Sequence, residues 1–261
     1  MSKPWRLQEI TYKEVKEQKY EVAVLPIGST EPHALHMPYG SDAFEAGMLA
    51  DSACERAHLE GASVILLPTV PYGVNRNLLG YPLTMNVDQS TLDAVVGDLL
   101  ASLEHHGIRK VVLFNGHGGN EFKGLLRTLY GRTKVFVTLV DWWKVAGDEH
   151  DAVFEASGDH ADEMETSVSL ALFEELVRME DMDDGAVHPT RFEAINQGWA
   201  QISRPWHLLT RSAGVGDPRK ATKEKGEQYI ELTVARMARF IKELSDAQMD
   251  ETFPFCTEWD G

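Results

Sequence analysis

The stretch RKVVLFNG, residues 109–116, decides the fold of this chain. Its centre is a continuous apolar run rich in valine, and it ends in glycine without any polar alternation. Such a run is typical of a strand that is buried on both faces, as in a parallel sheet. Three similar runs occur elsewhere: YEVAVLPIG (20–28), ASVILLPTV (62–70) and TKVFVTLVDWW (133–143).

Segments with helical periodicity separate and follow these runs. They cover residues 43–60, 87–107, 120–131, 168–179 and about 220–246, whereas residues 180–218 have no strong period. This alternation predicts an α/β fold, an open parallel sheet with helices on both faces. Because no internal repeat or Gly/Ser linker interrupts the chain, we predict a single domain over residues 1–261.

The composition excludes several classes of protein. The chain has 41 acidic and 25 basic residues, a formal charge of −16, and no Lys/Arg cluster, so no nucleic-acid partner is expected. No apolar run is long enough to span a membrane, and the first twenty residues lack the apolar core of a signal peptide. With two isolated cysteines and no CxxC pair, we expect a cytoplasmic protein.

Polar side chains gather where the first predicted strand ends, in GSTEPHALHMPYGSD (28–42). Glu31 and His33 are two residues apart, so in an extended segment they point the same way. Asp42 follows a turn and precedes a helix, where it would act either as an N-cap or as a metal ligand. Beside a Glu-x-His pair, the metal-ligand interpretation is favoured. His36, between Leu35 and Met37, is either a ligand or a packed structural histidine.

Two more polar segments are predicted at the same edge of the sheet, where parallel α/β proteins bind ligands. NGHGGN (115–120) lacks the lysine of a phosphate-binding loop, so His117 is a candidate ligand there. The N–H groups of Gly118 and Gly119 are candidates for binding a substrate oxygen. HADEMETS (160–167) offers His160, Asp162, Glu163 and Glu165, as helix caps, as ligands of a second metal, or as a general acid.

These segments resemble motifs of the creatininase (creatinine amidohydrolase) family. That family has a Glu-x-His-Gly-x-His-Leu-Pro stretch with a later aspartate, then Asn-Gly-His-Gly-Gly-Asn, then His-Ala-Gly-Glu-x-Glu-Thr-Ser. This chain reads EPHALHMPYGSD, NGHGGN and HADEMETS in the same order, and GVGDPRKATKEKGEQ (214–228) is similar to the closing motif of the family. The resemblance spans roughly residues 20–245.

The resemblance implies a three-layer α/β/α fold with a mostly parallel central sheet, and a two-metal centre. Glu31, Asp42 and His117 match the ligands of one metal; His33 and a bridging Asp42 match those of the other. Creatinine-hydrolysing members take their last ligand from a glutamate at the position that is Gly119 here. Glu163 is our first candidate to replace it, and Glu165 the second.

The resemblance also implies that His160 is the proton donor and that the protein is a homo-oligomer, often a hexamer. The chain departs from the family at four positions. Ala34 and Asp162 replace usual glycines, Leu78 replaces a common histidine, and Leu83 replaces a common glycine. These changes alter the pocket wall, so the substrate is less certain than the metal centre.

The expected activity is hydrolysis of a carbon–nitrogen bond in a small amide, cyclic amide or formamide. Two divalent ions, zinc first, with manganese or iron as alternatives, would lower the pKa of a bound water towards ~7 and supply hydroxide. A histidine such as His160 would protonate the leaving nitrogen, with Glu163 and Glu165 as neighbouring acids. The alternatives are a small-peptide or deformylating hydrolase, and a non-catalytic, metal-stabilised binding protein.

Aromatic residues are candidates for the substrate pocket. Trp142 and Trp143 follow the fourth predicted strand and would form a flat wall over a planar ligand, unless one of them belongs to the core or to a subunit contact. Trp206 and Arg76 are further candidates for the pocket wall.

Overall fold

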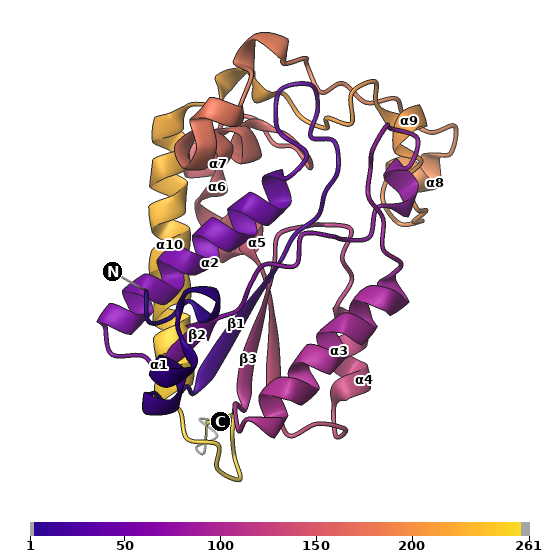
Figure 1. Ribbon diagram of the computed structural model, residues 1–261. Helices are drawn as coiled ribbons and strands as arrows, with labels where there is room; N and C mark the ends of the chain where they lie inside the picture. The colour runs from indigo at the N-terminus through magenta and orange to yellow at the C-terminus, as the bar shows by residue number, and fades with distance from the viewer. Residues whose placement is uncertain (1–2, 257–261) are drawn as a thin grey trace.

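The computed structural model describes residues 3–256. Its central sheet has four strands in the order β2-β1-β3-β4, and every pair is parallel (Figure 1). The strands cover Val22–Ile27 (β1), Val64–Leu66 (β2), Lys110–Asn115 (β3) and Phe136–Asp141 (β4). Each strand lies inside one of the four apolar runs, so the predicted parallel sheet is confirmed.

The two faces of the sheet are covered by different helices, which gives three layers (Figure 1). Val22 and Val24 of β1 pack into a core with α2 (Ser41–Leu59) and α10 (Lys223–Asp246). The alternate residues of β1 pack on the other face against α3 (Gln89–His105) and α4 (Lys123–Leu129). This period of two is what a strand buried on both faces requires. The α/β/α architecture is therefore confirmed.

The fourth strand differs from the expectation. Every residue of β4 is half-buried, whereas β1 and β3 are buried throughout. The reason is topological, because β4 lies at the edge of the sheet and pairs only with β3, whereas the other outer strand, β2, is covered by the segment that contains Trp5 and Arg6. Prediction of burial on both faces was correct for β1, β2 and β3 and wrong for β4.

The remaining helices are short, apart from the one that begins within the HADEMETS segment. That helix, α7 (Glu163–Phe173), begins beside Met164 as expected but ends before residue 179, where a 3₁₀ turn (Glu174–Leu176) replaces it. The others are α1 (Tyr12–Glu17), α5 (Trp142–Val145), α6 (His150–Val153), α8 (Glu193–Asn196) and α9 (Trp206–Leu209). Residues 180–218 are thus mainly irregular, as their lack of period indicated.

The first turn of α2 packs directly on the carboxyl ends of β1 and β3. A Cβ atom on Gly116 would lie 2.6 Å from the carbonyl oxygen of Asp42, and one on Gly28 would lie 2.5 Å from Ala43. Only glycine permits such a close approach. These two glycines therefore bring Asp42 to the edge of the sheet where Ile27 and Asn115 end their strands.

A buried lysine connects the opposite end of the sheet to α10. Lys110 of β3 is buried, and its Nζ donates to the carbonyl oxygens of Leu244 (2.7 Å) and Ala247 (2.8 Å) at the end of α10. These are carbonyls that a helix C-terminus leaves without partners. The lysine thus caps α10 and ties it to the sheet.

The N-terminal segment extends the sheet beyond β2. The N–H of Leu66 donates to the carbonyl of Trp5 (2.6 Å), and Arg6 forms a parallel bridge with Leu66. Asp51 of α2 accepts from the Trp5 indole N–H (2.9 Å) and pairs with Arg6 and Lys3. One carboxylate thus holds this segment on α2.

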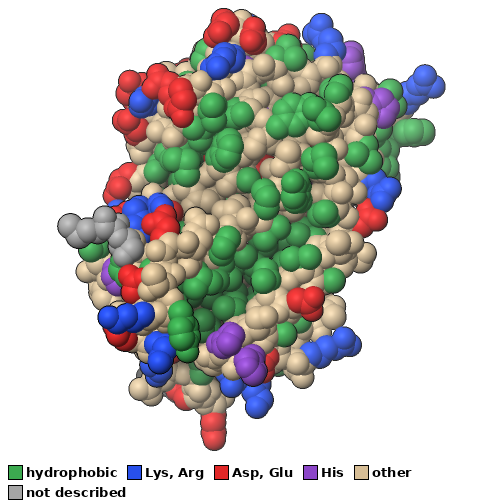
Figure 2. Space-filling model, viewed as in Figure 1, with side chains coloured by type: hydrophobic (Ala, Val, Ile, Leu, Met, Phe, Trp, Pro, Cys, Tyr) green, Lys and Arg blue, Asp and Glu red, His purple; other side chains and the backbone are tan. Residues whose placement is uncertain are grey.

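Hydrophobic side chains gather on the face that carries α2 and α3 (Figure 2). Exposed apolar residues of this part of the chain include Phe44 and Met48 of α2, Val95 of α3, and Leu83 and Met85 of the intervening loop. Contiguous exposed apolar surface is typical of interaction sites.

Candidate metal centre

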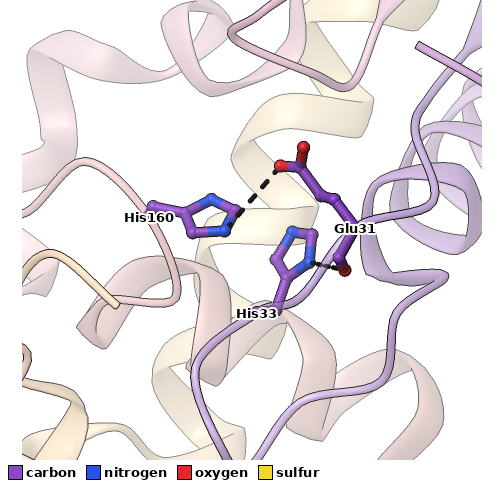
Figure 3. Close-up of side chains that lie close together, drawn as sticks. All are labelled: Glu31, His33 and His160. Carbon is purple, nitrogen blue, oxygen red and sulfur yellow. Dashed lines mark hydrogen bonds and ion pairs between the residues drawn. The ribbon is translucent and has the colours of Figure 1, made fainter. Parts of the chain in front are cut away.

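The loop that follows β1 places Glu31 and His33 side by side, as their spacing predicted (Figure 3). His33 Nδ1 lies 3.0 Å from the carbonyl oxygen of Glu31, so this nitrogen carries a proton and donates it to that carbonyl. His33 Nε2 lies 2.9 Å from Asp42 Oδ1. All three side chains are at most 2% exposed. The backbone contact therefore orients His33 so that Nε2 faces the carboxylates.

Asp42 does not cap its own helix. The N-cap of α2 is Gly40, which makes no side-chain cap, and the Asp42 carboxylate instead faces His33 and His117. The N-cap alternative is thus wrong for Asp42. The acid lies in the first turn of α2, where the helix dipole favours a negative charge.

His117 joins the cluster from the turn after β3. Its Nδ1 lies 3.2 Å from Glu31 Oε1 and 3.1 Å from Asp42 Oδ2, while its Nε2 lies 3.2 Å from the carbonyl oxygen of Val74. Asn115 donates to the His117 carbonyl (2.9 Å) and so fixes the turn. The ligand atoms of Glu31, Asp42 and His117 all lie within 4.8 Å of one another.

His160 approaches the same carboxylate from the other side (Figure 3). Its Nε2 lies 2.9 Å from the carbonyl oxygen of Pro32 and 3.7 Å from Glu31 Oε1. Its backbone forms an antiparallel bridge with Val215 of the closing motif. Glu31, His33 and His160 make a second group of ligand atoms within 4.8 Å. Glu31 belongs to both groups.

Burial and the clustered charges shift the pKa values of these residues. Although burial lowers the pKa of His33, the adjacent Asp42 carboxylate raises it to about 10. Burial likewise lowers the pKa of His117, but Glu31 and Asp42 together raise it well above its usual range. For His160 burial dominates, with a smaller effect of His33, and its pKa is lowered. The carboxylates therefore create a strong local preference for positive charge.

The donor set fits divalent cations. Among the residues that the structure describes, Glu31 Oε2 is buried without any hydrogen-bond partner. Leaving a buried carboxylate oxygen unpaired costs about 1–3 kcal/mol or more, so such an atom calls for an explanation. Carboxylate oxygens beside imidazole nitrogens are ligands for zinc and manganese. A cation would satisfy Glu31 Oε2.

The two glutamates of the HADEMETS segment point to different places. The buried Glu163 carboxylate accepts from the N–H groups of Glu155 (3.0 Å) and Ala156 (2.7 Å) and pairs with Lys225. Glu163 does not line the cavity at the cluster, whereas Glu165 does. Burial raises the pKa of Glu165 to about 8. Of the two candidates, Glu165, the second choice from the sequence, is thus the one that lines the cavity, although neither glutamate belongs to the two groups of ligand atoms.

Asp162 and His36 have structural contacts. Asp162 is the N-cap of α7 and accepts from the N–H of Glu165 (3.0 Å), so the capping alternative holds for this acid. His36 is buried, and its Nε2 lies 2.9 Å from Thr166 Oγ1 rather than at either ligand group. The packed, hydrogen-bonded interpretation of His36 therefore fits the structure better than a ligand role.

The cluster lies in a cavity of about 300 Å³. Gly118, Gly119, Trp143 and Trp206 line it, as expected for the pocket wall. Two expected wall residues lie elsewhere. Trp142 is 1% exposed in the core between the sheet and α10, and the exposed Arg76 pairs with Asp88. Among the lining residues that the sequence did not predict are Ile202, Ser203 and Arg204, from the segment without periodicity, and Asp159, directly before the HADEMETS motif.

Gly119 leaves no room for a side chain in this conformation. A Cβ atom there would lie 2.3 Å from His117 Nε2 and 2.5 Å from the carbonyl oxygen of Val74. This backbone accepts no side chain at position 119 without moving a ligand histidine.

Comparison with known proteins identifies the family of this chain. The creatininase (creatinine amidohydrolase) family model matches residues 8–241. A creatinine amidohydrolase from Pseudomonas putida is 28% identical over 93% of this chain and 98% of its own. A 3-dehydro-scyllo-inosose hydrolase from Thermotoga maritima is 31% identical over 66% of this chain and 58% of its own. A mycofactocin precursor peptide peptidase from Mycobacterium tuberculosis is 26% identical over 84% of this chain and 85% of its own.

Solved structures give the same result. The crystal structure of a Bacteroides fragilis protein provisionally named creatinine amidohydrolase has a TM-score of 0.88 and 35% identity, covering 96% of this chain and 100% of its own. A manganese creatininase and a Zn–Zn creatininase variant each have a TM-score of 0.74 and 25% identity, covering 94% of this chain and 100% of their own. The comparisons support a metal-dependent amide hydrolase.

None of the described helices is long and apolar enough to cross a membrane.

Proposed function

Because the chain belongs to the creatininase family, we propose that it hydrolyses a carbon–nitrogen bond of a small amide, cyclic amide or formamide with two divalent ions. One observation carries this proposal. Glu31 and Asp42 lie between three histidines at the bottom of the cavity, in two overlapping groups of ligand atoms. A structural site would be closed, whereas this one opens into a space large enough for a small substrate.

The ligand assignment follows the family resemblance, with Glu165 added because it lines the cavity. Glu31, Asp42 and His117 would hold one ion; His33, Asp42 and Glu165 would hold the other. Zinc is our first choice and manganese the second, with iron as a further alternative. When bound, two such ions polarise a carbonyl and lower the pKa of water, which is the chemistry that amide hydrolysis requires.

The remaining cavity residues bind substrate and move protons. His160 would pass a proton to the leaving nitrogen. The carbonyl of Pro32 holds its ring beside Glu31. The N–H groups of Gly118 and Gly119 would bind the substrate carbonyl oxygen, and Trp143 would cover a planar substrate. Glu163 would position the segment before His160 through its two backbone contacts.

Metal content tests this assignment. We expect about two ions per chain in the wild type, loss of both in Asp42→Ala, and loss of one in Glu165→Gln. Glu163→Gln is the matched control two residues away and should keep both ions. His160→Asn should keep the metals and lose amide turnover, because we assign it proton transfer rather than ligation. Absence of bound metal after repletion with zinc or manganese would end the proposal.

A second candidate function is cleavage of a small peptide. It is favoured by the match to a family member that is named a peptide peptidase. A panel of lactams, linear amides, formamides and dipeptides, assayed with the metal-loaded protein, separates the two. Turnover confined to dipeptides would favour the second function.

We also propose that the protein works in the cytoplasm as a homo-oligomer, hexameric by family resemblance. The apolar face over α2 and α3 supports an assembly (Figure 2). Light scattering of the purified chain measures the number of subunits. A monomer at micromolar concentration would contradict this part of the proposal.

A further inference from the structure

Arg204 lies at the mouth of the cavity, away from the metal ligands. It belongs to an irregular segment whose residues Ile202, Ser203 and Trp206 also line the cavity. Apart from histidines, Arg204 is the only basic side chain among the cavity-lining residues in the described part of the chain. The cavity therefore has carboxylates and imidazoles at its bottom and one permanent positive charge at its mouth.

An aromatic platform holds this guanidinium. Arg204 Cζ lies 4.8 Å from the centroid of the Trp206 ring, within the range of a cation–π contact. Trp206 is 5% exposed, and its ring centroid lies 5.1 Å from that of His160 at an angle of 67°. Trp206 thus connects the proton donor to the arginine. A stacked guanidinium is pre-ordered, so it loses less entropy when it binds a ligand.

The present partner of Arg204 is exchangeable. Its Nη1 pairs with Asp159, the residue before His160, on the opposite side of the mouth. The two side chains are 46% and 50% exposed. Exposed ion pairs of this kind contribute only about 0–1 kcal/mol, so replacing Asp159 with another carboxylate costs little. Within residues 3–256, Nε and Nη2 of Arg204 have no hydrogen-bond partner, which leaves donors for a ligand.

The charges around the cavity indicate what that ligand is. Glu31, Asp42 and Glu165 would be neutralised by metal ions, and Asp162 is used as the cap of α7. The charges left for the far end of a substrate are the guanidinium and its exchangeable partner Asp159. Arginine binds carboxylates through two parallel hydrogen bonds, a geometry that a neutral group cannot match.

We propose that Arg204 is a specificity-determining residue that binds a carboxylate at the far end of the substrate. The substrate class is then a small amide that carries a carboxylate on its acyl part. This inference rests on the proposed amide hydrolysis. Water adds across the C–N bond; its oxygen forms the new carboxylate, and its two protons go to the leaving nitrogen, which departs as an ammonium group. The product is an amine and a dicarboxylate, with one carboxylate at the metal centre and the other at Arg204.

The test measures binding of product-like probes to the metal-loaded full chain. The probes are the dicarboxylates from malonate to adipate, each compared by calorimetry with the monocarboxylate of the same chain length. At the chain length that spans the cavity, we expect the dicarboxylate to bind at least about tenfold more tightly than its monocarboxylate partner. We call the affinity for the dicarboxylate divided by the affinity for its monocarboxylate partner the affinity ratio. In Arg204→Met the affinity ratio should fall to about one, and in Arg204→Lys it should lie between one and the wild-type value.

A matched control and a second variant sharpen the test. Arg211, 76% exposed and outside this cavity, is the control: Arg211→Met should keep the wild-type ratio. Asp159→Asn removes the carboxylate that competes for Arg204, so it should increase the affinity for the dicarboxylate relative to the monocarboxylate. Metal content is measured for every variant, so that a collapsed site is recognised.

Three outcomes would overturn the inference. If monocarboxylates bind but no dicarboxylate binds more tightly, the role of Arg204 is refuted while the proposed hydrolase stands. If ω-amino acids bind more tightly than dicarboxylates and Asp159→Asn abolishes this, the mouth recognises an ammonium group instead. If the chain retains no metal and binds neither acid, the proposed function fails, and the inference fails with it.

Discussion

Replacing Gly119 with alanine should damage the metal centre, although Gly119 is not a ligand and lies two residues beyond His117. The added Cβ would lie 2.3 Å from His117 Nε2 and 2.5 Å from the carbonyl oxygen of Val74, far inside van der Waals contact. The imidazole can turn away, but the Val74 carbonyl belongs to the backbone and accepts the His117 Nε2 contact at 3.2 Å. The substitution therefore both overpacks the turn and removes the group that orients a ligand.

The magnitude follows from these two effects. Overpacking of this kind costs about 1–3 kcal/mol. For a chain of this size the cost corresponds to a melting temperature lower by about 2–10 °C. Loss of a partner that orients a metal ligand weakens metal affinity by about 10–100-fold. Calorimetry of the metal-free protein measures the first effect, and competition with a chelator of known affinity measures the second.

Gly118→Ala is the matched control, because a Cβ atom on Gly118 has nothing within 4 Å. It should leave the melting temperature and the metal affinity close to those of the wild type. Equal values for Gly118→Ala and Gly119→Ala would refute the reasoning. They would mean that the turn after β3 relaxes freely and that position 119 does not exclude a side chain.

Three further predictions concern stability. Lys110→Met leaves the end of α10 without its cap and should lower the free energy of unfolding in urea by about 1–3 kcal/mol. The control Lys242→Met, on the helix surface, should lower it by under about 0.5 kcal/mol. Equal losses would exclude the capping role. Although burial raises the pKa of Asp51, hydrogen bonds from Arg6, Trp5 and Lys3 lower it below its usual value. The stability that Asp51 contributes is therefore present above about pH 4 and lost below it. The difference in urea midpoint between wild type and Asp51→Asn should shrink from pH 6 to pH 3. A constant difference would contradict this. Ala34 has a φ of 52°, so Ala34→Gly should raise the melting temperature slightly, by the equivalent of at most about 1 kcal/mol. The relief of backbone strain should outweigh the extra conformational entropy that glycine gives the unfolded chain. A lower melting temperature would show that the alanine methyl group is needed.

The fold and half of the site could be predicted because their signals are local. A continuous apolar run such as residues 109–116 has to be buried on both faces, and the helices between such runs require a parallel sheet. In a parallel sheet the residues after the strands meet at one edge, which brings Glu31, His33 and His117 together. The edge strand β4 was predicted less well, because its own residues do not tell how many neighbours it has.

Tertiary structure alone decided the rest. Glu163 and Glu165 are two residues apart on one helix, so they point in directions about 200° apart, and only one of them can face the cavity. Which one does so depends on how α7 packs against α10, where Lys225 takes Glu163. Arg204 lies in a segment without period or motif, and its role at the mouth comes from Trp206 and Asp159. The sequence determines which residues can bind a metal or a substrate, whereas packing between distant segments determines which of them face the cavity.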